Sequence, residues 1–530
     1  MSTAEKLLKQ GRKNEIWTKY CGFLDLSQDE FMEIQERLLM EQINFLKNSE
    51  IGKKLLGDNS PTSLEEFRRK VSLTTYQDYE LQLKDKNADI LPFEPFAWAR
   101  TSGRSGEFSA KWAPYTKRMY DSLGEVSAGA LILSSCSRKG EIYLEPNDII
   151  LLATAPPPYT SGHISHSVED NLPVKFVPSL EEGEKMDFGG RIAEGFNLAM
   201  GTGLDYFFGL SSILTKIGER FENGSGNGSF SLANLNFKML PRLAKGMLKS
   251  KLNGRAPLPQ DFWDLKGIMS GGTDTNIYRD RIKHYWGKEP LEGYACTEGG
   301  NMAVQAWNYK GMTFFPDINF LEFIPFEEHL KSKDDPSYQP ETLLYTELQL
   351  GIYELVFTNL LGGVFTRYRV GDLIEVTALR DDELNIDLPQ IRFYSRADDL
   401  IDLAGFTRLT ESSIWQVIEA AGVEYEDWTA RKEEADGEPI LHIYIEPKET
   451  YKISLEELKS LIRAGLHQII PDFADLENMM GRDYLKVSQI QPGSFMKYME
   501  ARRSEGADLA HIKPPHMQAP DIVMDRLLQV

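Results

Sequence analysis

Several short segments combine hydroxyl, glycine and charged residues in patterns that can bind a nucleotide. The first is TSGRSGE at residues 101–107, with Ser102, Gly103 and Ser105 in the loop and Lys111 shortly after it. Glycines in a tight loop expose successive backbone N–H groups, hydroxyls add donors and a lysine adds charge, which together suit a polyphosphate. Taken alone, the segment also fits an ordinary turn. Its spacing is neither the Walker GxxxxGK[ST] nor the dinucleotide-binding GxGxxG pattern.

A second pair of segments places a carboxylate beside small residues. SGGTD at residues 270–274 contains Gly272 and Thr273, and YACTEGG follows at residues 294–300 with Glu298. A single carboxylate can hold Mg²⁺ while its loop lies along a nucleotide, since Mg²⁺ near phosphates is bound through one or two carboxylates. In isolation, a glycine-rich turn with a surface glutamate is the simpler interpretation.

Three further segments complete the set. YRVGD at residues 368–372 ends in Asp372 before an apolar run, and a carboxylate there can accept both hydroxyls of a ribose. Arg396 lies beside two aspartates in SRADDLI, and Lys513 lies in the late run HIKPPHM. Each of these segments is weak evidence when taken singly.

The elements that must position these residues follow from local patterns. Helices are predicted from Ser27, with Glu30 completing a capping box, from Ser63, with Glu66, and from Thr116. Short apolar runs alternate with helical patterns, which predicts an α/β protein with sheets inside; the runs are Ile149 to Ala153, Ile352 to Thr358 and Leu373 to Thr377.

The chain is predicted to divide into two domains. Residues 1–394 would form a large N-terminal domain of packed subdomains with mixed sheets. Residues 395–530 would form a small, mobile α+β C-terminal domain, with helix at 411–421, strand at 440–445 and helix at 454–469. The boundary between the two domains is expected near residues 395–402.

Composition limits the partners. The chain has 530 residues, and its 80 acidic against 59 basic residues give a net charge of −21, which argues against a nucleic-acid partner. The three cysteines, Cys21, Cys136 and Cys296, show no metal-ligand spacing, and no stretch resembles a signal peptide or a membrane span. We therefore expect a soluble, cytoplasmic protein with no membrane partner. The sequence leaves the oligomeric state open.

The order of the motifs carries more information than any one of them. TSG with a downstream lysine, YACTE, YRVGD, SRADDLI and a late lysine together resemble the signature set of the adenylate-forming (ANL) superfamily, over about residues 100–517. KWAPYT, FTRYRVGD, RFYSRADDLI and the ending GSFMKYMEARRSEGADLAHIKPPHM resemble more narrowly the Gretchen Hagen three family, the acyl acid amido synthetases first known as auxin-responsive plant proteins.

That resemblance implies an ATP- and Mg²⁺-dependent ligase. Such enzymes convert a small carboxylic acid and ATP into an acyl adenylate and pyrophosphate, and an amino acid amine then displaces AMP. By position, the phosphates would be lined by Ser102, Gly103, Ser105 and Lys111, and the nucleotide by Gly272, Thr273, Tyr294 and Thr297.

The resemblance also implies the reactive groups. Glu298 would bind Mg²⁺, Asp372 the ribose hydroxyls, and Arg396 would add a hydrogen bond at the hinge. Lys513 would reach the charge that develops at the α-phosphate, and rotation about residues 395–402 would remove it before the amine attacks. Lys513, Glu298 and Lys111 are therefore the expected catalytic residues.

Two features depart from the family pattern or fit it loosely. Arg104 stands where the family has a hydroxyl residue, and contact with a phosphate is favoured over obstruction of the loop. The segment from Met186 to Phe221 falls where the family places acyl-pocket helices, so Tyr206, Phe207 and Leu210 are candidates for substrate binding. Plain core packing is the alternative for these side chains.

Other interpretations stay open. His163 and His166 (SGHISH) could hold a metal, although a hydrogen-bonded structural pair fits better without a third ligand. Cys296 lies within the nucleotide motif, but packing accounts for it better than a nucleophilic role. At the level of function, the alternatives are an acyl- or aryl-CoA ligase with a thiol acceptor and a non-catalytic nucleotide-binding protein with a degenerate phosphate loop.

Overall fold

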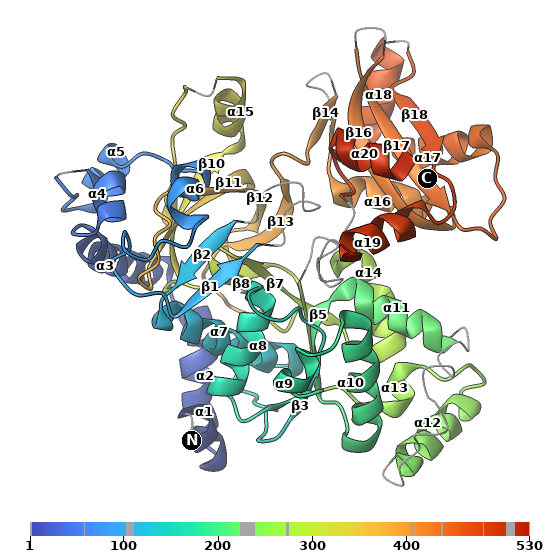
Figure 1. Cartoon of the computed structure of the whole chain (residues 1–530), viewed down its shortest axis with the longest axis horizontal. Coiled ribbons are helices and arrows are strands. Elements are labelled where there is room, and N and C mark those ends of the chain that lie inside the picture. The colour runs from blue at the N-terminus through green and yellow to red at the C-terminus, as the bar shows by residue number, and fades with distance from the viewer. Residues whose placement is uncertain are drawn as a thin grey trace. The chain divides into compact units, whose positions relative to one another are not determined.

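The computed structural model describes most of the chain. The described residues are 3–57, 59–101, 111–222, 239–271, 275–335, 337–403, 407–435, 438–480, 482–504 and 515–528. They form two compact units, which are the described parts of Met1–Thr101 with Ala110–Phe393, and of Tyr394–Val530 (Figure 1). The expected division into domains 1–394 and 395–530 with a movable hinge stays a prediction.

The first unit is built around a mixed sheet. Within the described residues the sheet has 11 strands in the order β10-β11-β12-β13-β9-β8-β7-β6-β5-β3-β4. A separate antiparallel pair joins β1 to β2. The strands are β1 (Ala97–Arg100), β2 (Trp112–Tyr115), β3 (Ile149–Leu152), β4 (Lys175–Val177), β5 (Tyr206–Leu210), β6 (Gly267–Gly271), β7 (Pro290–Cys296), β8 (Gly300–Gln305), β9 (Met312–Phe314), β10 (Asn319–Pro325), β11 (Gly351–Asn359), β12 (Tyr368–Ala378) and β13 (Gln390–Arg396).

The direction of the strands changes at β7. Strands β4, β3, β5, β6 and β7 are parallel to their neighbours in that order. From β7 onwards, the pairs β7–β8, β8–β9, β9–β13, β12–β11 and β11–β10 are antiparallel. Ligands in open α/β sheets bind at the carboxyl ends of the strands, next to such changes of topology. The predicted α/β class with mixed sheets is confirmed.

Helices cover both faces of the parallel strands. Helix α7 packs on β6, β7 and β8, whereas α10, α11 and α14 lie on the side whose core contains Leu151, Phe207 and Ile268 (Figure 1). The helices of this unit are α1 (Thr3–Lys9), α2 (Lys13–Cys21), η1 (Gly22–Asp25), α3 (Gln28–Leu46), α4 (Glu50–Leu56), α5 (Leu64–Lys70), α6 (Gln77–Leu83), α7 (Lys117–Ser135), α8 (Thr160–Asn171), α9 (Leu180–Gly183), α10 (Phe188–Thr202), α11 (Ser211–Glu222), α12 (Leu240–Leu252), α13 (Pro259–Phe262), α14 (Thr275–Trp286), α15 (Phe326–Asp334) and η4 (Tyr345–Glu347).

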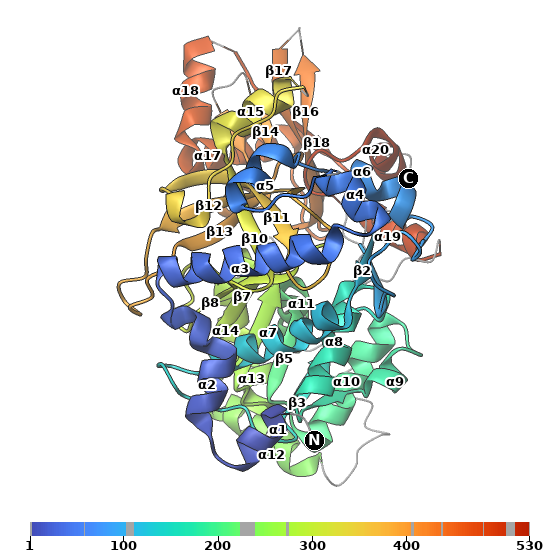
Figure 2. The same ribbon diagram turned by 90° about the vertical axis from the view of Figure 1, so that its left-hand side faces the viewer.

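The helix starts follow from the capping residues. Ser27 and Glu30 form the reciprocal capping box of α3, which packs against β10 (Figure 2). Ser63 accepts a hydrogen bond from the backbone N–H of Glu66, and Thr116 caps α7 in the same way. Because the cap satisfies backbone donors that have no partner inside the helix, these three starts are readable from sequence. All three predictions are confirmed.

The second unit is a small α+β domain. Strands β16 (Tyr425–Ala435) and β17 (Glu438–Pro447) are antiparallel, and β18 (Leu485–Gln489) adds to β17 in parallel. The other elements are β14 (Ile401–Leu403), β15 (Thr407–Leu409), α16 (Glu411–Ala420), α17 (Leu455–Ile469), α18 (Pro471–Met480), α19 (Ser494–Ser504) and α20 (Asp521–Leu528). The predicted helix, strand and helix correspond to α16, β17 and α17.

Candidate active site

Glu298 lies at the tip of the tight turn that joins the last parallel strand, β7, to its antiparallel neighbour β8. The turn comprises residues 297–299, and Gly300, which follows it, has a φ of +70°. That conformation is strained for any residue with a Cβ, which explains glycine at the position. The Glu298 carboxylate is thus held at the carboxyl end of the parallel half of the sheet.

Three buried side chains fix this turn. The backbone carbonyls of residues 297, 298 and 299 accept hydrogen bonds from Tyr115 Oη (2.6 Å), Asn359 Nδ2 (3.0 Å) and Asn319 Nδ2 (2.8 Å), respectively. Thr160 Oγ1 also donates to the hydroxyl of Thr297 at 2.9 Å. Tyr115, Asn319 and Asn359 are buried side chains, and the two asparagine bonds are fully shielded from competing water. The backbone that carries Glu298 is therefore rigid.

The Glu298 carboxylate has a donor and a cation beside it. Tyr368 Oη donates to Glu298 Oε1 at 2.9 Å, and Lys111 Nζ lies 3.9 Å from the same oxygen. Lys111 Nζ also lies 5.3 Å from the ring centroid of Tyr76, a cation–π distance. Glu298 is only 4 % exposed, whereas Lys111 is partly exposed and can reach a ligand from this position.

A second carboxylate is held by a neighbouring strand. Asp372 lies in β12, where Gly371 has a φ of +81°, and its Oδ2 accepts a 2.7 Å hydrogen bond from Tyr294 Oη. The Tyr294 ring stacks on Phe393 with centroids 6.3 Å apart. A buried carboxylate oriented by a phenol is suited to accept hydrogen bonds from vicinal hydroxyls.

The phenols around the site stay protonated. Burial and the charge of Glu298 raise the pKa of Tyr368 far above its ordinary value, so its hydroxyl remains a donor to the carboxylate. Burial, with a further contribution from Glu298, raises the pKa of Tyr76 to about 12. The Cys296 thiol is held neutral in the same way, because burial and then the charges of Glu298 and Asp372 raise its pKa well above its usual range. Packing therefore accounts for Cys296.

Part of the predicted site lies outside the described residues. This holds for Ser102, Gly103, Arg104, Ser105, Gly272, Thr273 and Lys513. The structure brings together Lys111, Glu298 and Thr297 at one turn, and it joins Tyr294 to Asp372 by a hydrogen bond. Arg396 is an exposed residue at the end of β13, a strand that begins in the first unit and continues past Phe393 into the second.

The three candidates for the acyl pocket differ in burial: Tyr206 and Phe207 are core residues, whereas Leu210 is exposed. Residues 206–210 form strand β5 instead of the expected helix, so neighbouring side chains point to opposite faces. Tyr206 belongs to the core that includes α7, and Phe207 to the core with α10, α11 and α14; neither has exposed surface. Core packing explains both residues. Leu210, at the carboxyl end of β5, is 39 % exposed and remains a candidate.

The two histidines of SGHISH bind different groups. His163 Nε2 lies 3.3 Å from the carbonyl of Trp98, and His166 Nε2 lies 2.5 Å from Glu184 Oε1. Burial lowers the pKa of His163, so its ring stays neutral. These contacts support the structural interpretation of the pair.

The residues fit Mg²⁺ through one carboxylate. Among the described residues, no group of three or more His, Cys, Asp and Glu side chains could hold a metal ion. Mg²⁺ does not require such a cage, since it is often bound by one or two carboxylates together with substrate phosphates. The oriented Glu298 carboxylate, with a lysine 3.9 Å away, has the chemistry of such a site.

Several residues of the site were missed by sequence reasoning. Tyr115, Asn319 and Asn359 hold the Glu298 turn, and Tyr76 lies beside Lys111. They come from segments far apart in the chain, and a lone tyrosine or asparagine has no distinctive spacing. Two supporting residues lie in or near a motif that could have indicated them. Tyr368 is part of YRVGD, and Asn359 lies shortly before it.

Comparison with known structures places the fold in a class. One solved structure, "AtGH3.15 acyl acid amido synthetase in complex with 2,4-DB", matches with a TM-score of 0.68 and 16 % identity, covering 97 % of this chain and 96 % of that one. A "2-Hydroxyisobutyryl-CoA Ligase (HCL) in the postadenylation state" matches with a TM-score of 0.61 and 14 % identity, covering 88 % of each chain. The fold is that of the adenylate-forming enzymes.

Family models identify the group more narrowly. Residues 22–167 match the GH3 family N-terminal domain, and residues 312–396 match the GH3 family central domain. These two segments of the chain are therefore similar to domains of the GH3 family. No curated protein matches its sequence. None of the helices in the described part of the chain is long and apolar enough to cross a membrane.

Proposed function

We propose that this protein is an ATP-dependent acyl-acid amido synthetase. A carboxylate oxygen of a small organic acid attacks the α-phosphorus of ATP, and pyrophosphate leaves. The amine nitrogen of an amino acid then attacks the acyl carbon, AMP leaves, and the amine loses a proton to solvent. The observation that carries the proposal is the rigid turn that presents Glu298 next to Lys111 in a chain with GH3 family domains.

The residues of the first unit have separate roles in adenylation. Lys111 attracts the phosphates, Asp372 accepts hydrogen bonds from the ribose hydroxyls, and Tyr294 orients Asp372 through the 2.7 Å bond. Glu298 would hold Mg²⁺, which supplies positive charge at the phosphates when it is bound. The turn already holds the Glu298 carboxylate in place before ATP binds, so the carboxylate needs little reorganisation when charge develops on the phosphates. Such preorganisation is the main source of electrostatic catalysis.

The remaining roles rest on sequence position. Lys513 would stabilise the charge at the α-phosphate during adenylation, with Ser102, Gly103, Arg104, Ser105, Gly272 and Thr273 along the nucleotide. Arg396 would lie at a hinge near residues 395–402, and rotation there would exchange Lys513 for the incoming amine. We also propose a cytoplasmic location, because the three cysteines are free thiols.

The acceptor is the feature to test first. The full-length enzyme is given ATP, Mg²⁺ and one acid at a time, together with a mixture of amino acids or with coenzyme A. We expect an amide and AMP in the first case. A thioester without amide would instead assign the protein as a CoA ligase, the activity named for the second neighbouring structure.

A non-catalytic nucleotide-binding protein is the other alternative. Such a protein would bind ATP in calorimetry yet show no acid-dependent release of pyrophosphate with any acid of a broad panel. Release with even one acid excludes this alternative, and the preferred acid then defines the substrate class.

A further inference from the structure

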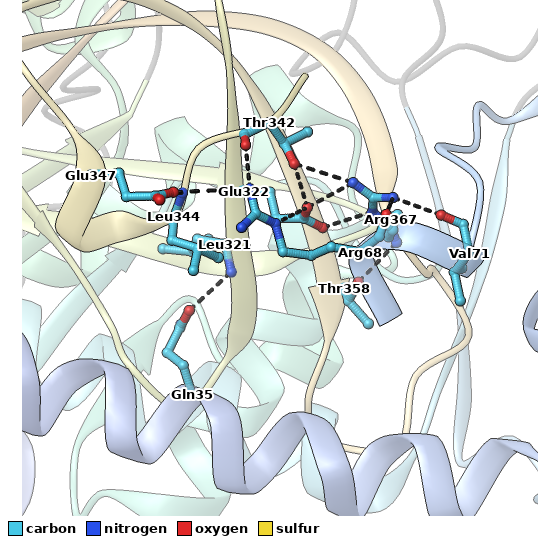
Figure 3. A network of polar contacts seen from close by, with 10 residues as sticks. All are labelled: Gln35, Arg68, Val71, Leu321, Glu322, Thr342, Leu344, Glu347, Thr358 and Arg367. Atoms are coloured by element: carbon cyan, nitrogen blue, oxygen red, sulfur yellow. Dashed lines mark hydrogen bonds and ion pairs between the residues drawn. The ribbon is translucent and has the colours of Figure 1, made fainter. Parts of the chain in front are cut away.

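Arg367, in the segment FTRYRVGD, is buried with all its side-chain donors satisfied (Figure 3). Its Nε and Nη2 donate to the two oxygens of Glu322 at 2.9 and 2.8 Å, and Nη2 also donates to Thr342 Oγ1 at 3.2 Å. Nη1 donates to the carbonyls of Arg68 (2.8 Å) and Val71 (2.6 Å). A guanidinium has five N–H donors, so the group is fully bonded. It ties the end of helix α5 to strand β10.

Stability alone is a weak reason for this arrangement. Arg367 has a φ of +44°, a conformation that costs a non-glycine residue about 1 kcal/mol or more. Its N–H donates to Thr358 Oγ1, and its carbonyl accepts from the N–H of Thr74. A buried ion pair is often no more stabilising than well-packed apolar residues. The surroundings hold Arg367 in one conformation, which fixes the backbone on both sides.

The next residue connects Arg367 to the site. Tyr368 pairs with Thr74 in an isolated parallel bridge, and its hydroxyl donates to Glu298. The aromatic rings of three neighbours lie around it, with centroid distances of 6.1, 5.5 and 4.8 Å to Tyr79, Phe357 and Phe365. The position of the Tyr368 side chain therefore depends on the backbone conformation at Arg367.

Arg367 is also connected to Lys111, through the segment from Val71 to Tyr76. The segment that begins at Val71, bound by Arg367, continues to Tyr76, whose hydroxyl accepts a 2.6 Å bond from the N–H of Trp112. The Tyr76 ring lies beside Lys111 Nζ. Arg367 therefore fixes one end of a segment that contacts both Tyr368 and the strand β2, which begins directly after Lys111.

We infer that Arg367 is a positioning residue for adenylation: its bonds to Glu322 and to residues 68–71 hold Tyr368, and through it the carboxylate of Glu298, in the orientation that binds the magnesium-bound triphosphate. This inference rests on the proposed function. Arg367 would act through Tyr368, because the guanidinium is already bonded to Glu322, Thr342 and residues 68–71.

Strand β12 offers a matched control two residues further on. Arg369 also pairs with a buried glutamate: its Nε and Nη2 donate to Glu354 at 2.8 and 2.6 Å, and Nη2 donates to Ser332 Oγ at 3.0 Å. His329 Nδ1 lies 2.6 Å from the same carboxylate. This pair joins β12 to β11 and, through Ser332 and His329, to α15, and it has no contact with Glu298 in the described part of the chain.

The test compares Arg367→Lys, Arg369→Lys, Tyr368→Phe and the double variant Arg367→Lys/Tyr368→Phe. Calorimetry gives the Kd for ATP with and without Mg²⁺, and pyrophosphate exchange gives kcat. We expect Arg367→Lys and Tyr368→Phe each to reduce the tightening of ATP binding by Mg²⁺ by about tenfold, the worth of one bond to a charged group. Arg369→Lys should keep the tightening of ATP binding by Mg²⁺ within about twofold of the wild-type value, even if its Tm falls as much as that of Arg367→Lys.

The double variant separates positioning from general damage. If Arg367 acts through Tyr368, the double variant loses no more than Tyr368→Phe alone. The inference would be overturned if the loss of Mg²⁺-dependent tightening in the double variant equalled the product of the two single losses. It would also be overturned if Arg367→Lys and Arg369→Lys had equal effects. If Arg367→Lys does not fold, the inference is decided by Glu322→Gln against Glu354→Gln with the same readouts. Failure of the wild type to exchange pyrophosphate with any acid would instead count against the proposed function.

Discussion

The site that we propose centres on a carboxylate, Glu298, whose backbone is held by three hydrogen bonds and whose side chain accepts one from the neutral phenol of Tyr368. Glu298 could be chosen from sequence because YACTE stands in an ordered series of motifs. Its supporting residues could not, because Tyr115 and Asn359 lie 182 and 61 residues from their partners in the turn. Hydrogen bonds across such separations depend on the folded sheet and have no local pattern.

Asp372 gives a prediction at the same scale. Replacement of Asp372 by Ala removes the acceptor that we assign to the ribose hydroxyls, and bonds to a charged group contribute about 1.5–3 kcal/mol. We therefore expect calorimetry to show about 10- to 100-fold weaker ATP binding.

The control for Asp372 is another buried aspartate. Asp381 accepts from Asn308 Nδ2 and from the backbone N–H groups of Glu383 and Leu384, so its role is structural. Asp381→Asn should bind ATP as the wild type does. Unchanged ATP affinity in Asp372→Ala would show that the ribose is bound elsewhere.

At the level of elements, local signals were sufficient for helix starts and insufficient for some strands. The caps at Ser27, Ser63 and Thr116 were readable because each bond spans three residues. Strand β5 was missed because a short run such as YFFGL has no period that separates strand from helix. The order of the strands in the sheet follows from long-range pairing, which the sequence does not encode locally.

One element of the second unit is anchored by a buried histidine. His516 lies between Glu411 Oε1 (2.8 Å) on α16 and Asp427 Oδ1 (2.7 Å) on β16, and its ring stacks on Trp428. Burial lowers the pKa of His516, but the two carboxylates outweigh it and raise the pKa to about 9. The imidazolium therefore stabilises this unit at neutral pH.

The sign of the pH effect follows from that shift. Since the folded pKa near 9 exceeds the unfolded value of 6.5, the contribution is complete below pH 6.5 and is lost as pH rises through 9. The difference corresponds to about 3 kcal/mol. Urea unfolding of the full chain, followed in the second unit, should show this loss between pH 6.5 and 9.5.

Two variants test the assignment to His516. Glu411→Gln removes one carboxylate and should shift the loss of stability to lower pH. His442→Gln is the control, because burial lowers the pKa of His442, and it should leave the alkaline loss unchanged. An alkaline loss that is the same in Glu411→Gln and the wild type would show that another group is responsible.

For the whole molecule, the net charge of −21 contrasts with a function that requires binding of a polyanion. Under the proposed function a local group of cations offsets this acidity: Lys111 in the first unit attracts the phosphates, and Lys513 would approach the nucleotide only for adenylation. The class of fold was predicted correctly from the sequence, whereas the division into domains 1–394 and 395–530 stays a prediction. The sequence could not predict the acid, because pocket shape depends on side chains from distant segments.

Lys513 provides the prediction at this scale. Lys513→Ala should leave ATP affinity nearly unchanged and slow adenylation by about 100- to 1,000-fold, the usual effect of removing one group that stabilises transition-state charge. Transfer from purified acyl adenylate to the amine should proceed at the wild-type rate, because Lys513 is withdrawn in that step. Pre-steady-state measurement gives the rates of adenylation and of transfer to the amine separately. Normal adenylation by Lys513→Ala would contradict the assigned role.

The most direct test of the central claim is acid-dependent ATP–pyrophosphate exchange by the wild type and by Glu298→Gln. The wild type should exchange label only when a suitable carboxylic acid is present. Glu298→Gln, which keeps the shape of the side chain but loses its charge, should exchange at least about 100-fold more slowly. Exchange by Glu298→Gln at the wild-type rate, or no exchange by the wild type with any acid, would contradict the account.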